Sequence, residues 1–321
     1  MRLPLSRELK RHADDSLAMS SYDPRRLVLL HTAAALGLNL LLSLLDYVLV
    51  NRIGDTGGLG GVGTRTMLST LRSLLQVAAY AVLPFWQAGY TCAAIALAHR
   101  QNPTPDTLLD GFRKFGRILR LKLAEAGVYL LASMICMTVS TQIFMMTPLA
   151  KPYLLLMQDI ALSLDGSATL TPELMTQMTE AIFPVMYIFG ALFIVVAVFL
   201  FYQFRMAMYL LLHKDNVGAI AALKGSWRRM KGNRLDMLKL DLSFWWFYLL
   251  DIGCTAVLYL DLLLALTGVS LPVSTDAMFF LCLIGHCLCQ LGLYTWMRNK
   301  VDVTYIHGYD AILGSSAYPT D

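Results

Sequence analysis

Two ionisable side chains, Asp251 and His286, stand deep inside long apolar stretches of the sequence. At about 1.5 Å per helical residue, Asp251 would lie about 13–14 Å along its helix from Leu242, close to the middle of a bilayer. His286, nine residues into the next apolar run, reaches a similar depth from the opposite side. An acid and an imidazole at equal depth could share a proton or form an ion pair, because burying either charge alone in hydrocarbon is costly. Alternatively, Asp251 is protonated and bonded to a hydroxyl or backbone group, or it faces a hydrated cavity that serves packing only.

Neutral polar residues also interrupt the apolar stretches, and Gln87 is the most suggestive of them. It lies one turn after Pro84, which frees a backbone carbonyl, so the two residues could line a small polar cavity. The alternative for Gln87, as for Asn39 and Gln290, is an interhelical hydrogen bond that serves packing. Together with the acid and the imidazole, Gln87 completes a candidate polar site at the bilayer midplane.

A further candidate is a stripe of possible metal ligands. Cys282, His286 and Cys289 share one helical face, and Cys287 lies beside it. Imidazole and thiolate ligands suit a soft transition metal. One helix rarely brings three ligands to a single ion, however, and the end residues of this stripe would be about 10 Å apart. Cysteine also packs as a small hydrophobic residue, so we predict no metal and no cofactor.

Sequence signatures of enzymes are missing. The chain contains no G-x-S-x-G, no H-E-x-x-H and no Walker A lysine. The stretch 58–63 matches G-x-G-x-x-G, but that fingerprint binds a dinucleotide only between a strand and a helix. Here we expect a flexible glycine loop outside the membrane. The sequence therefore predicts a protein that is not an enzyme.

The elements that would position these side chains are helices in a membrane. Hydrophobic residues make up 57% of the 321 residues and charged residues 15%, with a mean hydropathy of +0.56. Soluble domains carry about 25% charged residues, so a soluble enzyme, a disordered scaffold and a nucleic-acid-binding protein are excluded. Six apolar runs are long enough to cross about 30 Å of hydrocarbon as helices. They are 27–50, 74–97, 121–146, 181–212, 242–266 and 277–296.

The basic residues predict how the six helices are oriented. Of the 26 Lys and Arg residues, 22 lie before the first run, after the last, or in the second-to-third and fourth-to-fifth connections, counted from Arg100 to Lys122 and from Arg205 to Lys239. Because positive residues favour the cytoplasmic side, both termini are expected in the cytoplasm. We therefore predict one all-α membrane domain over 1–321. It would have a cytoplasmic segment at 1–26, a six-helix bundle at 27–297 and a cytoplasmic tail at 298–321.

Three of the cytoplasmic segments are predicted to be short amphipathic helices. Their apolar stripes are Leu5, Leu9, Ala13 and Leu17; Leu108, Phe112, Phe115 and Leu119; and Ile220, Leu223, Trp227 and Met230. Such helices lie flat at the inner leaflet with their basic residues near anionic headgroups. The candidate headgroup contacts are Arg113, Lys114, Arg117, Lys224, Arg228 and Arg229. Alternatively, these residues only fix the topology.

The second and third of these segments are alike. Residues 111–116 read G-F-R-K-F-G, and residues 225–232 read G-S-W-R-R-M-K-G. The repeated unit would be an interfacial helix followed by a helical hairpin, with a period of about 105–115 residues. Duplicated membrane folds often place their sites where the repeats meet. The alternative is that any hairpin bundle needs basic amphipathic connectors.

Several stretches resemble one bacterial family. Residues 222–233, A-L-K-G-S-W-R-R-M-K-G-N, and 242–245, L-S-F-W, resemble the motifs A-L-K-x-S-W-x-x-M-K-G and L-S-F-x-x-W of the membrane proteins called domain of unknown function 975. Residues 8–17 resemble its opening L-K-x-x-A helix, and 304–309 its closing aromatic segment. A Pro-Tyr pair typical of the last span is replaced around 292–294. The resemblance implies a bacterial plasma-membrane protein with six helices, and it implies no activity.

Two functions are compatible with these features. The first is a non-catalytic protein that organises lipids or a membrane partner through its basic helices. Its partners would be membrane lipids and either another membrane protein or a second copy of the chain, and not nucleic acid. The second is a transporter or permease for a small solute or for protons, with a midplane site around Asp251 and His286. Charge reversal in the basic helices would abolish the first function, and Asp251→Asn would abolish the second.

Overall fold

The computed structural model describes residues 6–48, 59–148, 150, 151, 153–156, 172–214, 216–260, 264 and 274–314. Regular structure within these residues is helical and includes no strand, which confirms the predicted all-α fold class. The long helices are α2 (Pro24–Val48), α3 (Leu59–Ala98), α5 (Phe115–Met145), α7 (Pro172–Phe204) and α13 (Thr275–Leu313). The short ones are α1 (Ser6–Ala18), η2 (Pro105–Leu109), α4 (Asp110–Arg113), α8 (Ala207–His213), α9 (Ala219–Met230), α10 (Arg234–Leu242) and α11 (Trp245–Leu258).

Five helical segments within the described residues are long and apolar enough to cross a membrane. They are Pro24–Leu45, Ser69–Ala98, Phe115–Met145, Ile182–His213 and Asp276–Leu313. Helices α10 and α11 are bent by 64° relative to each other and make a sixth candidate if the pair is one span. Each of the six predicted runs therefore overlaps a candidate span, and the chain has the helices of a polytopic membrane protein.

Two long helices begin well before the apolar runs that predicted them. Helix α3 begins at Leu59, so the stretch expected to be a glycine loop is helical from that residue onward, and Gly58 lies outside the described residues. Helix α7 begins at Pro172, a residue whose fixed φ suits the first position of a helix. The apolar runs therefore predicted where helices cross the membrane, but not how far they extend beyond it.

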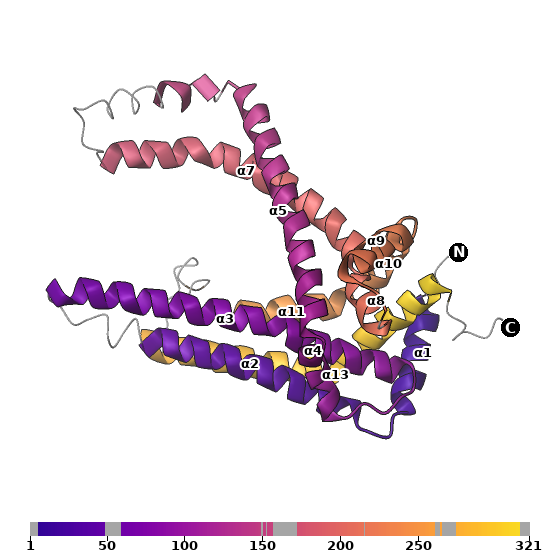
Figure 1. Cartoon of the computed structure of the whole chain (residues 1–321). Coiled ribbons are helices and arrows are strands. Elements are labelled where there is room, and N and C mark those ends of the chain that lie inside the picture. Colours follow the sequence, from indigo (N-terminus) through magenta and orange to yellow (C-terminus); the bar gives the residue numbers. More distant parts are fainter. Residues whose placement is uncertain are drawn as a thin grey trace. The chain divides into compact units, whose positions relative to one another are not determined.

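The described residues form two compact units. The larger comprises parts of 1–119 and 206–321, and the smaller comprises parts of 120–205. In the larger unit α13 packs on α2, α3 and α11, and α2 also packs on α3 (Figure 1). The core between them buries Val28, Tyr90, Ala93 and Leu108, with Trp86 and Tyr294 packed against it. In the smaller unit a separate cluster buries Phe144, Ala150 and Val185.

Each predicted amphipathic segment forms one or two short helices that pack on another helix of the protein. Helices η2 and α4 pack on α3, and α9 packs on α8, so both dock on the helix that precedes them. Helix α1 instead packs on α13, at the opposite end of the sequence. It buries Leu9, Ala13 and Ser16. The apolar face of α1 is therefore covered by the protein itself, which differs from the position in lipid expected from the sequence.

Two glycines allow the backbone of α3 to touch the η2–α4 segment. A Cβ on Gly89 would lie 1.8 Å from the carbonyl oxygen of Leu108, and a Cβ on Gly111 would lie 1.9 Å from that of Phe85. Gly225, the counterpart of Gly111 in the second motif, would place its Cβ 3.2 Å from Leu210 Cδ1 of α8. Both copies of the motif thus place a glycine against the preceding helix, which supports the internal duplication.

Helix α13 continues far beyond the predicted end of the last span. It is capped at its start by Ser274, whose hydroxyl accepts a hydrogen bond from the Ala277 amide at 3.3 Å. It ends at Gly314, which has a φ of 64° that favours glycine. Residues 303–310 of this helix are all buried, because α1 and α3 cover them. Of the segment expected to be a cytoplasmic tail, residues 298–313 therefore continue α13 and pack within the larger unit, and residues 315–321 lie outside the described residues.

Candidate functional site

Asp251 lies on α11 and contacts α13 through a neutral amide. Its Oδ1 is 3.5 Å from Gln290 Nε2, and the same amide nitrogen is 3.3 Å from the hydroxyl oxygen of Tyr294. The amide donates and the carboxylate accepts, so this long contact stabilises the acid without a cation. The arrangement corresponds to interhelical bonding by Gln290, one of the alternatives that the sequence left open.

His286 lies on α13 and bonds to the backbone of α11. Its Nδ1 is 2.8 Å from the carbonyl oxygen of Cys254. A carbonyl only accepts, so we infer that Nδ1 carries a proton and that Nε2 of the neutral ring is an acceptor. The hydrogen bonds of His286 and Asp251 thus go to different partners, and the direct pair suggested by their equal depth is not formed. Sequence gives the depth of a residue in a helix but not the direction of its side chain.

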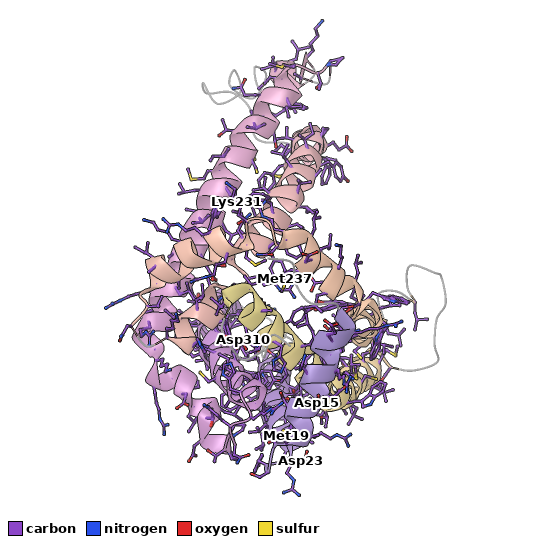
Figure 2. All side chains as sticks on the ribbon, turned by 90° about the vertical axis from the view of Figure 1, so that its right-hand side faces the viewer. Asp15, Met19, Asp23, Lys231, Met237 and Asp310 are labelled. Carbon is purple, nitrogen blue, oxygen red and sulfur yellow. The ribbon has the colours of Figure 1, made fainter. Side chains whose placement is uncertain are left out.

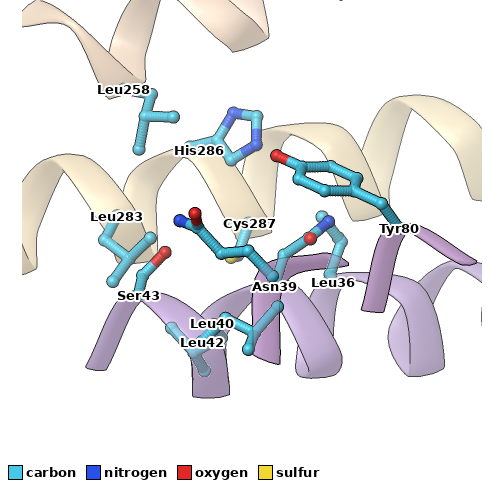
Figure 3. A pocket seen from close by; sticks show the side chains of 11 residues that line it. Leu36, Asn39, Leu40, Leu42, Ser43, Tyr80, Leu258, Leu283, His286 and Cys287 are labelled. Carbon is cyan, nitrogen blue, oxygen red and sulfur yellow. The ribbon is translucent and has the colours of Figure 1, made fainter. Parts of the chain in front are cut away.

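A cavity of about 230 Å³ opens beside His286, between α2, α3, α11 and α13 (Figure 3). Its other polar groups are Asn39 and Ser43 of α2 and Gln76 and Tyr80 of α3. None of these four side chains is hydrogen-bonded to any residue that the structure describes. The remaining lining residues are Leu36, Leu40, Leu42, Leu258, Leu283 and Cys287. The cavity therefore offers unused, uncharged hydrogen-bonding groups on an apolar wall.

Gln87 does not line this cavity. Its Oε1 accepts a hydrogen bond from Arg298 Nη2 at 2.8 Å. The Arg298 guanidinium also lies over the rings of Tyr90 and Tyr294, 4.9 Å and 4.7 Å from their centroids. Gln87 therefore anchors a cation–π cluster between α3 and α13, as the packing alternative for this residue predicted. Of the three midplane candidates, only His286 lines the cavity.

The cysteines of α13 do not gather into a metal centre within the described part of the chain, where no group of three His, Cys, Asp or Glu side chains could hold an ion. Cys282 is buried, Cys287 lines the cavity and Cys289 is exposed. The three thiols thus point to different surroundings.

Arg117, one of the basic candidates, is used inside the protein. Its Nη2 lies 2.8 Å from the carbonyl oxygens of Leu211 and Lys214 and 3.1 Å from that of Val217. These carbonyls belong to the end of α8 and the segment after it, where backbone acceptors lack helical partners. Arg117 therefore ties the start of α5 to the end of α8 and is not a free headgroup contact.

Of the other basic candidates, Lys114 is half-buried and the remaining four lie at the surface. Arg113 pairs with Asp110 at 2.8 Å. On α9, Lys224, Arg228 and Arg229 are exposed, whereas Ala222, Leu223, Ser226 and Met230 of the same helix are buried. The exposed face also carries Ile220 and Trp227, which are 66% and 40% exposed. Half of the predicted apolar stripe of α9 is therefore left uncovered, beside three cations.

The larger unit also contains a buried polar site that was not predicted from the sequence. Asp310 of α13 is fully buried (Figure 2). Its carboxylate accepts a hydrogen bond from the Tyr209 hydroxyl and lies 3.0 Å from His99 Nε2. The ring of His213 is stacked on Tyr209 at 5.2 Å and lies 5.3 Å from the ring of His99. An acid, a phenol and two imidazoles from α3, α8 and α13 thus meet at one point.

Helix α1 adds two more side chains to this site. His307, one turn before Asp310, places Nε2 at 3.1 Å from Ser16 Oγ, and Ser16 in turn donates to the carbonyl of Ala98 at 3.3 Å. The ring of His12 lies 6.2 Å from that of His307. We call these seven residues the Asp310 cluster: His12, Ser16, His99, Tyr209, His213, His307 and Asp310.

A sequence signal for the cluster existed. A histidine lies at or near the end of three candidate spans, Ser69–Ala98, Ile182–His213 and Asp276–Leu313. These histidines are His99, His213 and His307. Each residue taken alone is a polar residue at a helix end, which is ordinary. His99 and His213 are 114 residues apart, which fits the proposed period, whereas His307 follows His213 after 94 residues. Repeated membrane folds often place sites where the repeats meet.

The hydrogen bond to Asp310 raises the pKa of the His99 imidazole above its usual range, and it outweighs burial, which lowers it. A base with a raised folded-state pKa stabilises the fold fully below its unfolded pKa of about 6.5. That contribution is lost as the pH rises through the raised folded-state pKa. Below about pH 6.5, the His99–Asp310 pair therefore contributes fully to holding the end of α3 to α13.

Comparison with known proteins identifies the family and nothing more specific. The chain has no significant match among curated proteins and none among solved structures. Residues 4–311 match the family described as protein of unknown function (DUF975). The match covers the motifs at both ends of the chain and the segment from α9 to α11. The chain therefore belongs to this family of unknown function, as its resemblance had implied.

Proposed function

We propose that this protein is a non-catalytic membrane protein that binds a small, neutral, polar solute in the cavity beside His286 and acts as a permease for it. The unbonded side chains of Asn39, Ser43, Gln76 and Tyr80 carry this proposal. Ser43 and Gln76 are half-buried, and Asn39 and Tyr80 are exposed. In a membrane these groups would face hydrocarbon, where a polar group without a partner costs several kcal/mol. An occupant that bonds to these groups would recover that free energy.

The chemistry of the lining defines the class of solute. Within the part of the chain that the structure describes, the cavity is lined by amides, hydroxyls, one imidazole, leucines and a cysteine, and by no Lys, Arg, Asp or Glu. A charged solute would find no counter-ion there, whereas a polyol or an amide would find both donors and acceptors. Since a cavity of about 150 Å³ holds benzene, one of about 230 Å³ holds about nine non-hydrogen atoms.

We propose that the protein lies in the bacterial plasma membrane with both termini in the cytoplasm. The excess of Lys and Arg in alternate connections supports this orientation. The cavity residues fall within the candidate spans Pro24–Leu45, Ser69–Ala98 and Asp276–Leu313 and on α11. A solute bound there would be inside the membrane, as a permease requires.

Solute flux tests the proposal. Full-length protein in liposomes should speed the re-swelling of vesicles placed in glycerol or urea gradients, followed by stopped-flow light scattering. Asn39→Leu and Ser43→Ala should each slow the protein-dependent rate about fivefold, the equivalent of one hydrogen bond of about 1 kcal/mol. Ser73→Ala is the matched control, because its hydroxyl bonds to Ser69 within α3 and does not line the cavity. Equal rates in protein-free and wild-type vesicles for glycerol, urea and erythritol would refute the permease.

The exposed face of α9 supports a second candidate function, the organisation of anionic lipids. Ile220 and Trp227 are suited to the acyl boundary, and Lys224 and Arg228 flank them at helical spacing. Each basic residue near an anionic surface contributes about 1 kcal/mol. Replacing Lys224 and Arg228 together by Gln should therefore weaken phosphatidylglycerol binding about 30-fold, measured by the rise in melting temperature as the lipid is titrated into micelles.

The control for the lipid experiment is a double variant at basic residues that pair with acids. Arg113 bonds to Asp110 at 2.8 Å and Lys239 bonds to Asp236 at 3.0 Å. Arg113→Gln with Lys239→Gln should leave the lipid response close to that of the wild type. If both double variants lose the response equally, α9 has no special role and the effect reports net charge.

A further inference from the structure

The Asp310 cluster connects a buried acid to the surface through imidazoles. Asp310 and Tyr209 are almost completely buried, whereas the His99 side chain is 24% exposed. His213, whose ring lies 5.3 Å from that of His99, is exposed. Imidazoles exchange protons with water near neutral pH. A proton can therefore reach Asp310 from solvent through two histidines without any opening of the fold.

The charges in and around the cluster leave room for one proton but not for two. His99 and Tyr209 face Asp310 from α3 and α8, and they already use its two carboxylate oxygens. The groups that face His307 are His12 from α1, His99 and Arg100 from the end of α3, and Asp310 on its own helix. The first proton forms the His99–Asp310 ion pair. A second proton would add an uncompensated cation beside Arg100 in a buried place, which is costly.

The second proton would act on the contact between α1 and α13. His307 is 7% exposed and touches α1 at two points, through the bond to Ser16 and through the ring of His12. A cation at His307 would be desolvated there, against the ring of His12. Exposure to water relieves this cost, and displacement of the 13-residue helix α1 would provide that exposure.

We propose that the Asp310 cluster is a proton-binding site, and that a second proton bound there loosens helix α1 from α13. The first proton, held between His99 and Asp310, keeps α3, α8 and α13 together. Acidification then protonates His307, and the stable state is one in which α1 is displaced and this imidazole is hydrated. The proposal is independent of the solute cavity, which shares no residue with the cluster.

Hydrogen exchange of α1 tests this proposal. Backbone exchange of full-length protein in micelles would be measured by mass spectrometry at about pH 7.5 and pH 5.5, with rates corrected by an unstructured reference peptide. Because one proton binds when α1 detaches from α13, the equilibrium constant for detachment rises tenfold for each pH unit below the imidazole pKa of about 6.5. Protection of Ser6–Ala18 should therefore fall about tenfold at the lower pH, while that of α2 changes less than about twofold.

The variants separate the cluster from a general effect of acid. His307→Gln keeps a donor for Ser16 but cannot titrate, so protection of α1 should become independent of pH. His307→Asn, a shorter amide that cannot titrate either, should behave in the same way and decides the matter if His307→Gln fails to fold. His286→Gln is the control, because this histidine bonds to Cys254 and lies outside the cluster, and it should behave as the wild type. Unchanged protection of α1 in the wild type, or an equal loss of protection in the amide variants of His307, overturns the proposal.

Discussion

Gly111→Ala is expected to lose the folded larger unit. The new Cβ would lie 1.9 Å from the carbonyl oxygen of Phe85 and 2.6 Å from the amide nitrogen of Gly89, both of which are backbone atoms of α3. A flexible side chain could move aside, but a backbone within a helix cannot do so without shifting the helix. Overpacking normally costs about 1–3 kcal/mol, and we expect more than about 3 kcal/mol here. The measurement is the melting temperature and the monodisperse yield of the variant in micelles.

Gly116→Ala is the matched control, because this glycine closes the same G-F-R-K-F-G motif. Its Cβ would meet no atom within 4 Å, and the residue lies in the first turn of α5. Alanine is favoured over glycine in a helix by up to about 1 kcal/mol, so this variant should melt slightly above the wild type. If the two alanine variants melt together, α4 does not approach α3 as closely as the structure has it.

Arg117→Met is expected to destabilise the larger unit by about 2–4 kcal/mol, because three carbonyl oxygens lose a charged donor. Methionine keeps most of the aliphatic stem, so the loss reports the guanidinium and not packing. The free energy of unfolding in mixed micelles would be compared with that of the wild type. The loss should be the same in micelles with and without anionic lipid.

Arg113→Met is the control for this charge removal. Arg113 lies four residues earlier and pairs with Asp110, but two thirds of its side chain is exposed. Pairs of this kind contribute less than about 1 kcal/mol, so the variant should unfold close to the wild type. If Arg117→Met destabilises only in the presence of anionic lipid, Arg117 is a headgroup contact and its bonds to α8 are of no consequence.

The parts of the fold that depend on composition were predicted from the sequence. Long apolar runs predicted the all-α fold class and the approximate positions of the spans. Short apolar stripes flanked by basic residues predicted the helices between them. The course of α13 after Trp296 was not predicted, because Arg298, Asn299 and Lys300 end the apolar run. The helix nevertheless continues, since α1 buries one of its faces and supplies Asp14 to bond Lys300 at 2.7 Å. That partner is almost the whole chain away in sequence.

For the candidate site, the sequence predicted how far along its helix each residue lies, but not the direction of its side chain. Asp251 and His286 lie on adjacent helices, as expected, but rotation about each helix axis directs one toward Gln290 and the other toward Cys254. A helix that is apolar on all sides has no periodicity from which this rotation can be read. The sequence suggests an interhelical hydrogen bond for Asn39, yet its side chain lines the cavity without a bonded partner among the described residues. Whether a polar side chain finds a partner depends on the positions of all the helices around it.

The docking of α1 on α13 has a consequence for the order of synthesis. Ser16 and His307 are 291 residues apart, and at about 5–20 residues per second a ribosome needs about 15–60 s to cover that distance. During this interval η2, α4 and α9 can already dock, because each follows the helix that it packs on. Helix α1 is made first but must wait for α13, with Leu9 and Ala13 lacking the surface of α13 that buries them. A nascent chain halted before α13 would therefore carry an undocked apolar helix at its amino end, a feature by which quality-control machinery could recognise an unfinished molecule.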